Sequence, residues 1–117
     1  MPFKVYYLDD EPGLLEIFVE TFSSKNIEIT TFEDPVRAIE EIKKNPPDLF
    51  FIDYRLPKIT GDKIAQAVSP TIPKALIAGE ISVKTETKFD AVFEKPYDSK
   101  AVESFIEEQY RSKKKAA

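Results

Sequence analysis

The amino-acid sequence predicts an α/β fold, in which a parallel β-sheet carries helices on both faces. Short apolar runs rich in β-branched and aromatic residues alternate, five times along the chain, with segments whose apolar residues recur at helical spacing. Such alternation favours parallel strands joined by right-handed crossovers. The 117 residues, 42% of them hydrophobic, suffice for one core. We therefore expect one domain over residues 1–117.

The first three elements are a buried strand, a helix and an edge strand. Residues 3–8 (FKVYYL) form a short apolar run of the kind that lies inside a sheet. The next segment has apolar residues at helical spacing, namely Leu14, Leu15, Phe18, Val19 and Phe22. Residues 27–32 (IEITTF) alternate between apolar and polar side chains, which is typical of a half-exposed strand.

The second predicted helix begins after Asp34, which can cap it, with Pro35 at the first helical position. Its inward face is expected to carry three apolar residues, Val36, Ile39 and Ile42, and the NPP run at 45–47 ends it. Residues 48–53 (DLFFID) are predicted to form a third, buried strand. A short helix follows at residues 60–68.

Two more strands are predicted at residues 74–78 (KALIA) and 91–94 (AVFE). The segment between them, residues 79–90, has no clean apolar stripe, so we expect a short or distorted helix there. The last helix is capped by Asp98 and turns an apolar face inward, formed by Ala101, Val102, Phe105, Ile106 and Tyr110. The basic run RSKKK suits its C-terminal end, and residues 113–117 are expected to fray.

The composition excludes several kinds of site. The chain has no cysteine and no histidine, so it has no disulfide, no Cys- or His-ligated zinc and no Ser-His-Asp triad. A net charge of −4 argues against nonspecific nucleic-acid binding. No apolar run approaches the roughly 20 residues of a membrane span, and no signal peptide is evident. We therefore expect a soluble cytoplasmic domain that binds neither nucleic acid nor membrane.

Charged residues stand at the ends of three of the predicted strands. Asp9 and Asp10 follow the first strand, Asp53 ends the third, and Lys95 follows the fifth. In a parallel α/β sheet, ligands bind beyond the carboxyl ends of the strands. We therefore expect three carboxylates and one ammonium group to lie together at one edge of the sheet.

This cluster indicates chemistry with a metal ion and a phosphoryl group. Adjacent carboxylates are explained if a cation lies between them, and Mg²⁺ binds through one or two carboxylates together with phosphate oxygens. Asp53 would then be free to attack a phosphoryl group, and Lys95 would balance charge on the transferred oxygens. Each residue alone reads more simply as a capping, turn or loop residue, whereas the joint arrangement favours a functional site.

Three sequence motifs carry a resemblance to a known family. The runs LDDEP, FFIDYRLPKITGD and FEKPY resemble, in order and spacing, the receiver domain of two-component response regulators, and the resemblance covers essentially the whole chain. It implies a doubly wound, flavodoxin-like receiver fold with strand order 2-1-3-4-5. It also implies transfer of a phosphoryl group from a histidine kinase or a phosphotransfer protein.

The resemblance assigns roles to individual residues. Asp9 and Asp10 match the acidic pair that holds Mg²⁺, Asp53 matches the phosphoacceptor, and Lys95 matches the lysine that follows the fifth strand. Arg55 stands where the family uses a backbone carbonyl as a metal ligand, so its side chain is not implicated.

The turn after the acceptor strand also fits the family. Pro57 and Gly61 match its pattern, and we expect glycine to permit a backbone conformation that other residues resist. The bond from Lys95 to Pro96 is expected to be cis, as is usual in the family and accessible to X-Pro bonds.

Two positions depart from the family pattern. The fourth strand normally ends in a Ser or Thr whose hydroxyl bonds the phosphoryl group, but Ala78 stands there. The aromatic position of the fifth strand is Val92, with Phe93 beside it. In the family these residues couple phosphorylation to a conformational change. We therefore expect that phosphorylation persists, while the conformational change is weaker or involves other residues.

The leading hypothesis is a stand-alone receiver that signals by contact with an unknown downstream protein and catalyses at most its own phosphorylation and dephosphorylation. The alternative is a degenerate receiver that binds a partner independently of phosphate. A flavodoxin-like cofactor binder is disfavoured, because the chain has only three glycines and acidic strand ends repel phosphate.

Overall fold

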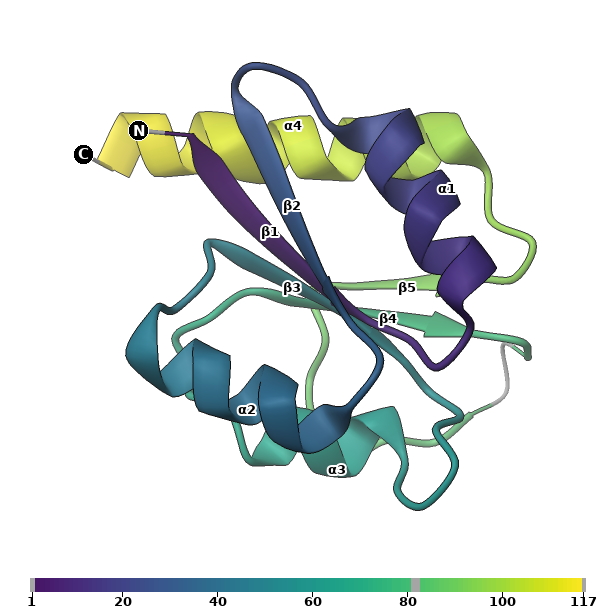
Figure 1. Cartoon of the computed structure of the whole chain (residues 1–117). Helices are drawn as coiled ribbons and strands as arrows, with labels where there is room; N and C mark the ends of the chain where they lie inside the picture. Colours follow the sequence, from purple (N-terminus) through teal and green to yellow (C-terminus); the bar gives the residue numbers. More distant parts are fainter. Residues whose placement is uncertain (1, 81–82, 117) are drawn as a thin grey trace.

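A five-stranded parallel sheet forms the middle layer, in the order β2-β1-β3-β4-β5 (Figure 1). The computed structural model describes residues 2–80 and 83–116. The strands are β1 (Phe3–Leu8), β2 (Ile27–Phe32), β3 (Leu49–Asp53), β4 (Lys74–Ala78) and β5 (Ala91–Glu94). The predicted parallel sheet and its strand order are therefore confirmed, and β2 is an edge strand as its alternating pattern indicates.

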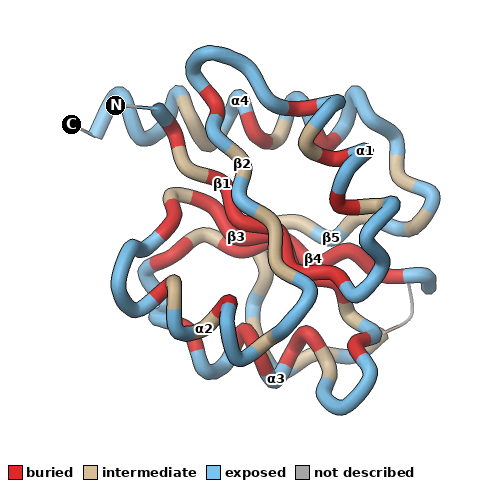
Figure 2. The backbone as a smooth tube through the Cα atoms, in the orientation of Figure 1, coloured by how far each residue is buried: buried red, intermediate tan, exposed pale blue. Residues whose placement is uncertain are grey.

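Helices cover both faces of this sheet (Figure 1). Helices α1 (Pro12–Phe22) and α4 (Ser99–Ala116) pack on one face, and α2 (Pro35–Lys44) and α3 (Gly61–Gln66) pack on the other. Each face has its own apolar core. The buried residues concentrate in the middle strands, as Figure 2 shows, because β1, β3 and β4 have neighbours on both edges and both faces.

The capping predictions hold, but two inward positions are wrong. Asp34 and Asp98 each accept a hydrogen bond from the backbone N–H two residues later. Val36, expected in the core, is 63% exposed, and Ala101 is exposed as well. Helix α2 buries Ile42, as predicted, and Ala38 in place of Val36. Ala38 and Ile42 lie one turn apart, and Val36 lies more than 100° around the helix from both.

The short or distorted helix predicted at residues 79–90 is wrong for the part that the structure describes. Residues 79–80 and 83–90 contain no helix, and residues 81–82 lie outside the description. Burial patterns instead alternate between exposed and half-buried from residue 83 to residue 90, as in an extended segment. The described parts of the connection from β4 to β5, residues 79–80 and 83–90, are therefore loop segments.

A carboxylate from α3 fastens this loop. Asp62, 7% exposed, accepts hydrogen bonds from the backbone N–H groups of Glu86 at 2.8 Å and Thr87 at 3.0 Å. Burial alone raises the pKa of Asp62, but these bonds outweigh it and hold the pKa below its usual range. Tertiary hydrogen bonds thus satisfy backbone donors that a helix would otherwise pair.

The last helix extends into the segment that was expected to fray. Helix α4 continues through Lys113–Lys115 to Ala116, and Ala117 lies outside the described residues. Lys113 forms an ion pair with Asp48, the residue just before β3. This contact ties the last turns of α4 to the sheet.

Candidate functional site

Three carboxylates meet at the carboxyl edge of the sheet. Asp9 and Asp10 follow β1, and Asp53 is the last residue of the neighbouring strand β3. Each offers an oxygen atom, and these atoms all lie within 4.8 Å of one another. Asp9 is 0% exposed and Asp53 is 4% exposed, whereas Asp10 is open to solvent. Two negative charges are therefore held out of water next to a third.

Lys95 lies between the two buried carboxylates. Its Nζ is 3.0 Å from Asp53 Oδ1 and 3.2 Å from Asp9 Oδ2. Its backbone N–H donates to the carbonyl of Ala78 at 2.7 Å, which fixes the chain just beyond β5. Burial disfavours the charged amine, but the hydrogen bond to Asp53 and the charges of both carboxylates raise the pKa of Lys95 overall. Lys95 is therefore a permanent cation of the site.

Asp9 is held by a further side chain that sequence reasoning missed. The hydroxyl of Tyr7 donates to Asp9 Oδ2 at 2.5 Å, and the backbone N–H of Glu11 donates to Asp9 Oδ1 at 3.0 Å. Tyr7 is two residues before Asp9, so both point to the same face of the strand. That spacing was the available signal, and none of the family motifs includes Tyr7.

Asp53 is in an unfavourable position for a negative charge. Burial is the main cause that raises its pKa to about 6; the charges of Asp9 and Asp10 raise it further, and Lys95 opposes them. At neutral pH the carboxyl is mostly ionised, at a cost in free energy. One lysine thus does not compensate three carboxylates, and a second cation would stabilise the cluster.

The backbone of Asp53 is packed against the first residue of α3. A Cβ on Gly61 would lie 2.3 Å from the carbonyl oxygen of Asp53 and 2.9 Å from Ile52 Cγ2. The N–H of Gly61 also donates to the Tyr54 carbonyl at 2.8 Å. Gly61 has no positive φ, so the expected special backbone conformation is wrong. Close approach requires glycine here instead.

The donor set fits Mg²⁺. The cluster offers only carboxylate oxygens, two of them from buried residues, and hard oxygen ligands with a high charge suit this ion. The Arg55 side chain is exposed and pairs with Glu80 across the two loops that flank the site. This leaves the backbone carbonyl of Arg55 as a predicted ligand.

Comparison with known proteins identifies the family. A family model described as the response regulator receiver domain matches residues 5–103. The chain belongs to this family. The match spans β1 to the first turn of α4 and so contains every element that contributes to the acidic cluster. The cis bond from Lys95 to Pro96 agrees with the expectation drawn from the family.

Solved structures show the same receiver fold. A CheY-like receiver domain of Methanospirillum hungatei matches with a TM-score of 0.88 and 18% identity, covering 100% of both chains. A CheY-like receiver domain of Methylobacillus flagellatus matches with a TM-score of 0.82 and 20% identity, covering 93% of this chain and 99% of that one. The chemotaxis response regulator CheY4 of Vibrio cholerae matches with a TM-score of 0.82 and 18% identity, covering 93% and 99%.

The two positions predicted to depart from the family pattern lie in different surroundings. Ala78, at the end of β4, is buried and presents only a methyl group. Val92 is 51% exposed, whereas its neighbour Phe93 packs against Phe51 and Phe105 on the other face of β5. Neither alanine nor valine carries a hydroxyl group or an aromatic ring.

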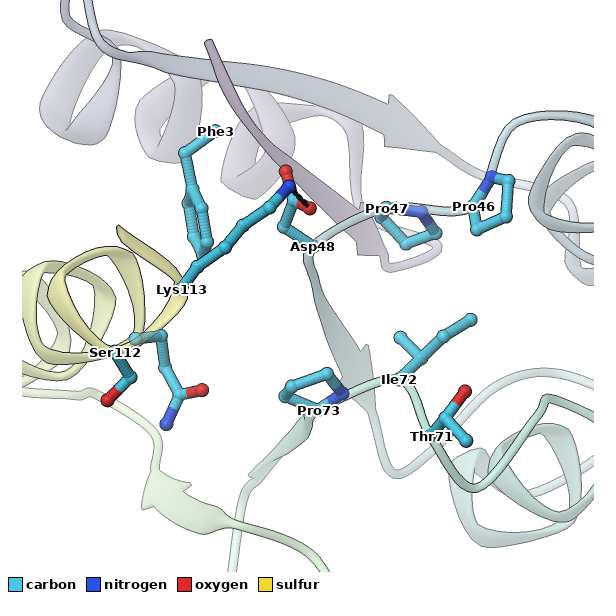
Figure 3. Close-up of a pocket in the computed structure, with 10 residues that line it drawn as sticks. Phe3, Pro46, Pro47, Asp48, Thr71, Ile72, Pro73, Ser112 and Lys113 are labelled. Atoms are coloured by element: carbon cyan, nitrogen blue, oxygen red, sulfur yellow. Dashed lines mark hydrogen bonds and ion pairs between the residues drawn. The ribbon is translucent and has the colours of Figure 1, made fainter. Parts of the chain in front are cut away.

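A hollow of about 430 Å³ lies at the opposite edge of the sheet, where the strands begin (Figure 3). Its lining includes Phe3, Pro47, Asp48 and Lys113, and none of its lining residues belongs to the acidic cluster.

No helix in the described part of the receiver domain combines the length and hydropathy that a membrane span requires.

Proposed function

We propose that this receiver domain accepts a phosphoryl group on Asp53, from the phosphohistidine of a histidine kinase or phosphotransfer protein, in a reaction that depends on Mg²⁺. The supporting observation is the arrangement around Asp53: a nearly buried carboxylate whose oxygen lies 3.0 Å from Lys95 Nζ, beside the acidic pair Asp9 and Asp10. A downstream protein would then recognise the phosphorylated state by direct contact.

The chain's own residues supply most of this chemistry. An Asp53 oxygen attacks phosphorus, the O–P bond forms, the N–P bond of the donor breaks, and the imidazole nitrogen keeps the electron pair and takes up a proton. Mg²⁺, held by Asp9, Asp10, Asp53 and the Arg55 carbonyl, would offset the charge of the phosphoryl oxygens. Lys95 turns from the carboxylates to those oxygens and stabilises their charge.

The test is phosphorylation by acetyl phosphate, which needs no partner. With Mg²⁺ the wild-type protein should gain the mass of one phosphoryl group, and EDTA should prevent the gain. Asp53→Asn should gain nothing, because the nucleophile is missing, and Asp10→Ala should lose most of the reaction, because it removes the exposed metal ligand. Intact-mass spectrometry measures all four. Equal labelling of wild type and Asp53→Asn would refute the assignment of the acceptor.

A second candidate function is a receiver that binds its partner independently of phosphate. It is favoured by Ala78, which has no hydroxyl, and by the absence of a helix in residues 79–80 and 83–90 before β5. A wild-type protein that gains no phosphoryl group from acetyl phosphate or phosphoramidate, at saturating Mg²⁺, would support this candidate over the first.

A further inference from the structure

One oxygen of Asp9 has two hydrogen-bond donors. Asp9 Oδ2 accepts from the Tyr7 hydroxyl at 2.5 Å and from Lys95 Nζ at 3.2 Å. The other oxygen, Oδ1, accepts from the backbone N–H of Glu11 at 3.0 Å. Asp9 has no exposed surface, so the protein itself must supply the donors that water supplies to an exposed carboxylate.

Tyr7 is fixed in place and remains a donor. Its ring is fully buried, 4.5 Å from the Phe18 ring and 6.5 Å from the Phe51 ring between centroids. These contacts hold the ring, so the hydroxyl oxygen stays next to Asp9 Oδ2 and can donate to it.

Lys95, in contrast, has a second task in the proposed reaction. Its Nζ contacts both Asp9 and Asp53, and its side chain is partly exposed at the mouth of the site. A phosphoryl group on Asp53 brings new oxygens that attract this ammonium group. When Lys95 turns to them, Asp9 Oδ2 loses one of its two donors at a place that water does not reach.

We propose that Tyr7 is a positioning residue that makes this exchange possible. Its hydroxyl keeps donating to Asp9 Oδ2 after Lys95 has moved to the phosphoryl oxygens. Lys95 can therefore leave without depriving this buried carboxylate oxygen of its last hydrogen bond. This inference rests on the proposed phosphorylation of Asp53. It assigns to Tyr7 a role in binding the phosphoryl group, distinct from its packing in the core.

The physical reason is the cost of a buried carboxylate oxygen that accepts no hydrogen bond. Without the hydroxyl, Lys95 is the remaining donor to Asp9 Oδ2, and moving it leaves that oxygen without a hydrogen bond from the protein. A lost hydrogen bond to a charged group weakens binding by roughly tenfold or more. Mg²⁺ alone brings no phosphoryl oxygens, so Lys95 can stay on Asp9 and the affinity for Mg²⁺ should change much less.

The test uses Tyr7→Phe and a matched control, Tyr6→Phe. The Tyr6 hydroxyl also donates one short hydrogen bond, to the Asn45 carbonyl at 2.6 Å, but Tyr6 belongs to the core on the other face of the sheet. Each variant loses one hydroxyl and keeps its ring. The probe is beryllium trifluoride, a phosphoryl mimic, titrated at constant Mg²⁺ and followed by backbone amide NMR; Mg²⁺ alone is titrated separately.

Tyr7→Phe should bind beryllium trifluoride roughly tenfold more weakly than wild type. Its affinity for Mg²⁺ should stay within about threefold of the wild-type affinity. Tyr6→Phe should bind both ligands as the wild-type protein does. Unchanged beryllium trifluoride binding in Tyr7→Phe would overturn the inference, as would equal weakening in Tyr6→Phe. Absence of binding by the wild-type protein would instead refute the proposed function, and Tyr7's role with it.

Discussion

Asp53→Asn is expected to stabilise the metal-free protein at pH 8 and to have little effect near pH 4. Asp53 has a pKa of about 6 in the folded protein, against 3.8 for an unperturbed carboxyl, chiefly because it is buried. The folded state therefore binds more protons than the unfolded state between these values. As the pH rises through this window, the free energy of unfolding falls by about 2 to 3 kcal/mol. Asparagine cannot ionise, so the variant avoids this loss.

Urea unfolding in EDTA at both pH values measures the effect. Glu108→Gln, which removes an exposed carboxyl from α4, is the control and should change the free energy of unfolding by less than about 0.5 kcal/mol. Added Mg²⁺ should reduce the difference in the free energy of unfolding between Asp53→Asn and wild type at pH 8. The ion stabilises the wild-type cluster, with three carboxylates, more than the variant cluster, with two. If Asp53→Asn is less stable than wild type at pH 8, then the ionised Asp53 carboxylate stabilises the folded protein, contrary to this prediction.

Gly61→Ala should destabilise the protein by about 1 kcal/mol net, although alanine favours helices. The added Cβ meets the Asp53 carbonyl oxygen at 2.3 Å, and a backbone atom cannot move aside by a change of rotamer. Overpacking of this kind costs about 1 to 3 kcal/mol, which exceeds the gain of about 1 kcal/mol from helix propensity. The strain falls directly on the proposed acceptor.

Gly13→Ala provides the matched control. Gly13 is also a helical glycine, in α1, but its Cβ would meet no atom of the described residues within 4 Å. It should stabilise the protein by up to about 1 kcal/mol. Thermal or urea unfolding compares the two variants. If Gly61→Ala is as stable as Gly13→Ala, then the contact between α3 and the Asp53 backbone is looser than described.

The elements whose pattern is local were predictable from the sequence. The apolar runs that end in Asp9 and Asp53 are buried strands, and pairing both in one parallel sheet brings their ends together. Lys95 joins them because its strand ends at the same edge. Strand ends could therefore be located from periodicity, and with them the place of the cluster.

Features that depend on tertiary contacts were not predictable in this way. Residues 83–90 form a loop that Asp62, more than twenty positions earlier, holds by accepting hydrogen bonds from the backbone of Glu86 and Thr87. Gly61 is needed for a contact across the turn, not for its own φ. Val36 lies outside the core because Ala38 and Ile42 face the sheet. In each case the local structure depends on a contact with a residue distant in sequence, or on which face of a helix packs against the sheet.

The loop and Ala78 together bear on how this receiver domain would signal. Ala78 offers no hydroxyl to a phosphoryl group, and Val92 faces solvent. The Gly61 contact links the Asp53 backbone to the helix turn that contains Asp62, which holds the loop. The backbone of Asp53 is thus linked through Gly61 and Asp62 to the backbone of Glu86 and Thr87.

The most direct test of the central claim is to locate the phosphoryl group. Borohydride reduces an aspartyl phosphate to homoserine, which peptide mass mapping assigns to one position. After treatment with acetyl phosphate and Mg²⁺, we predict homoserine at position 53 and unchanged aspartate at positions 9 and 10. Homoserine at either of those two positions, or at none of the three in a protein shown to carry phosphate, would contradict the account.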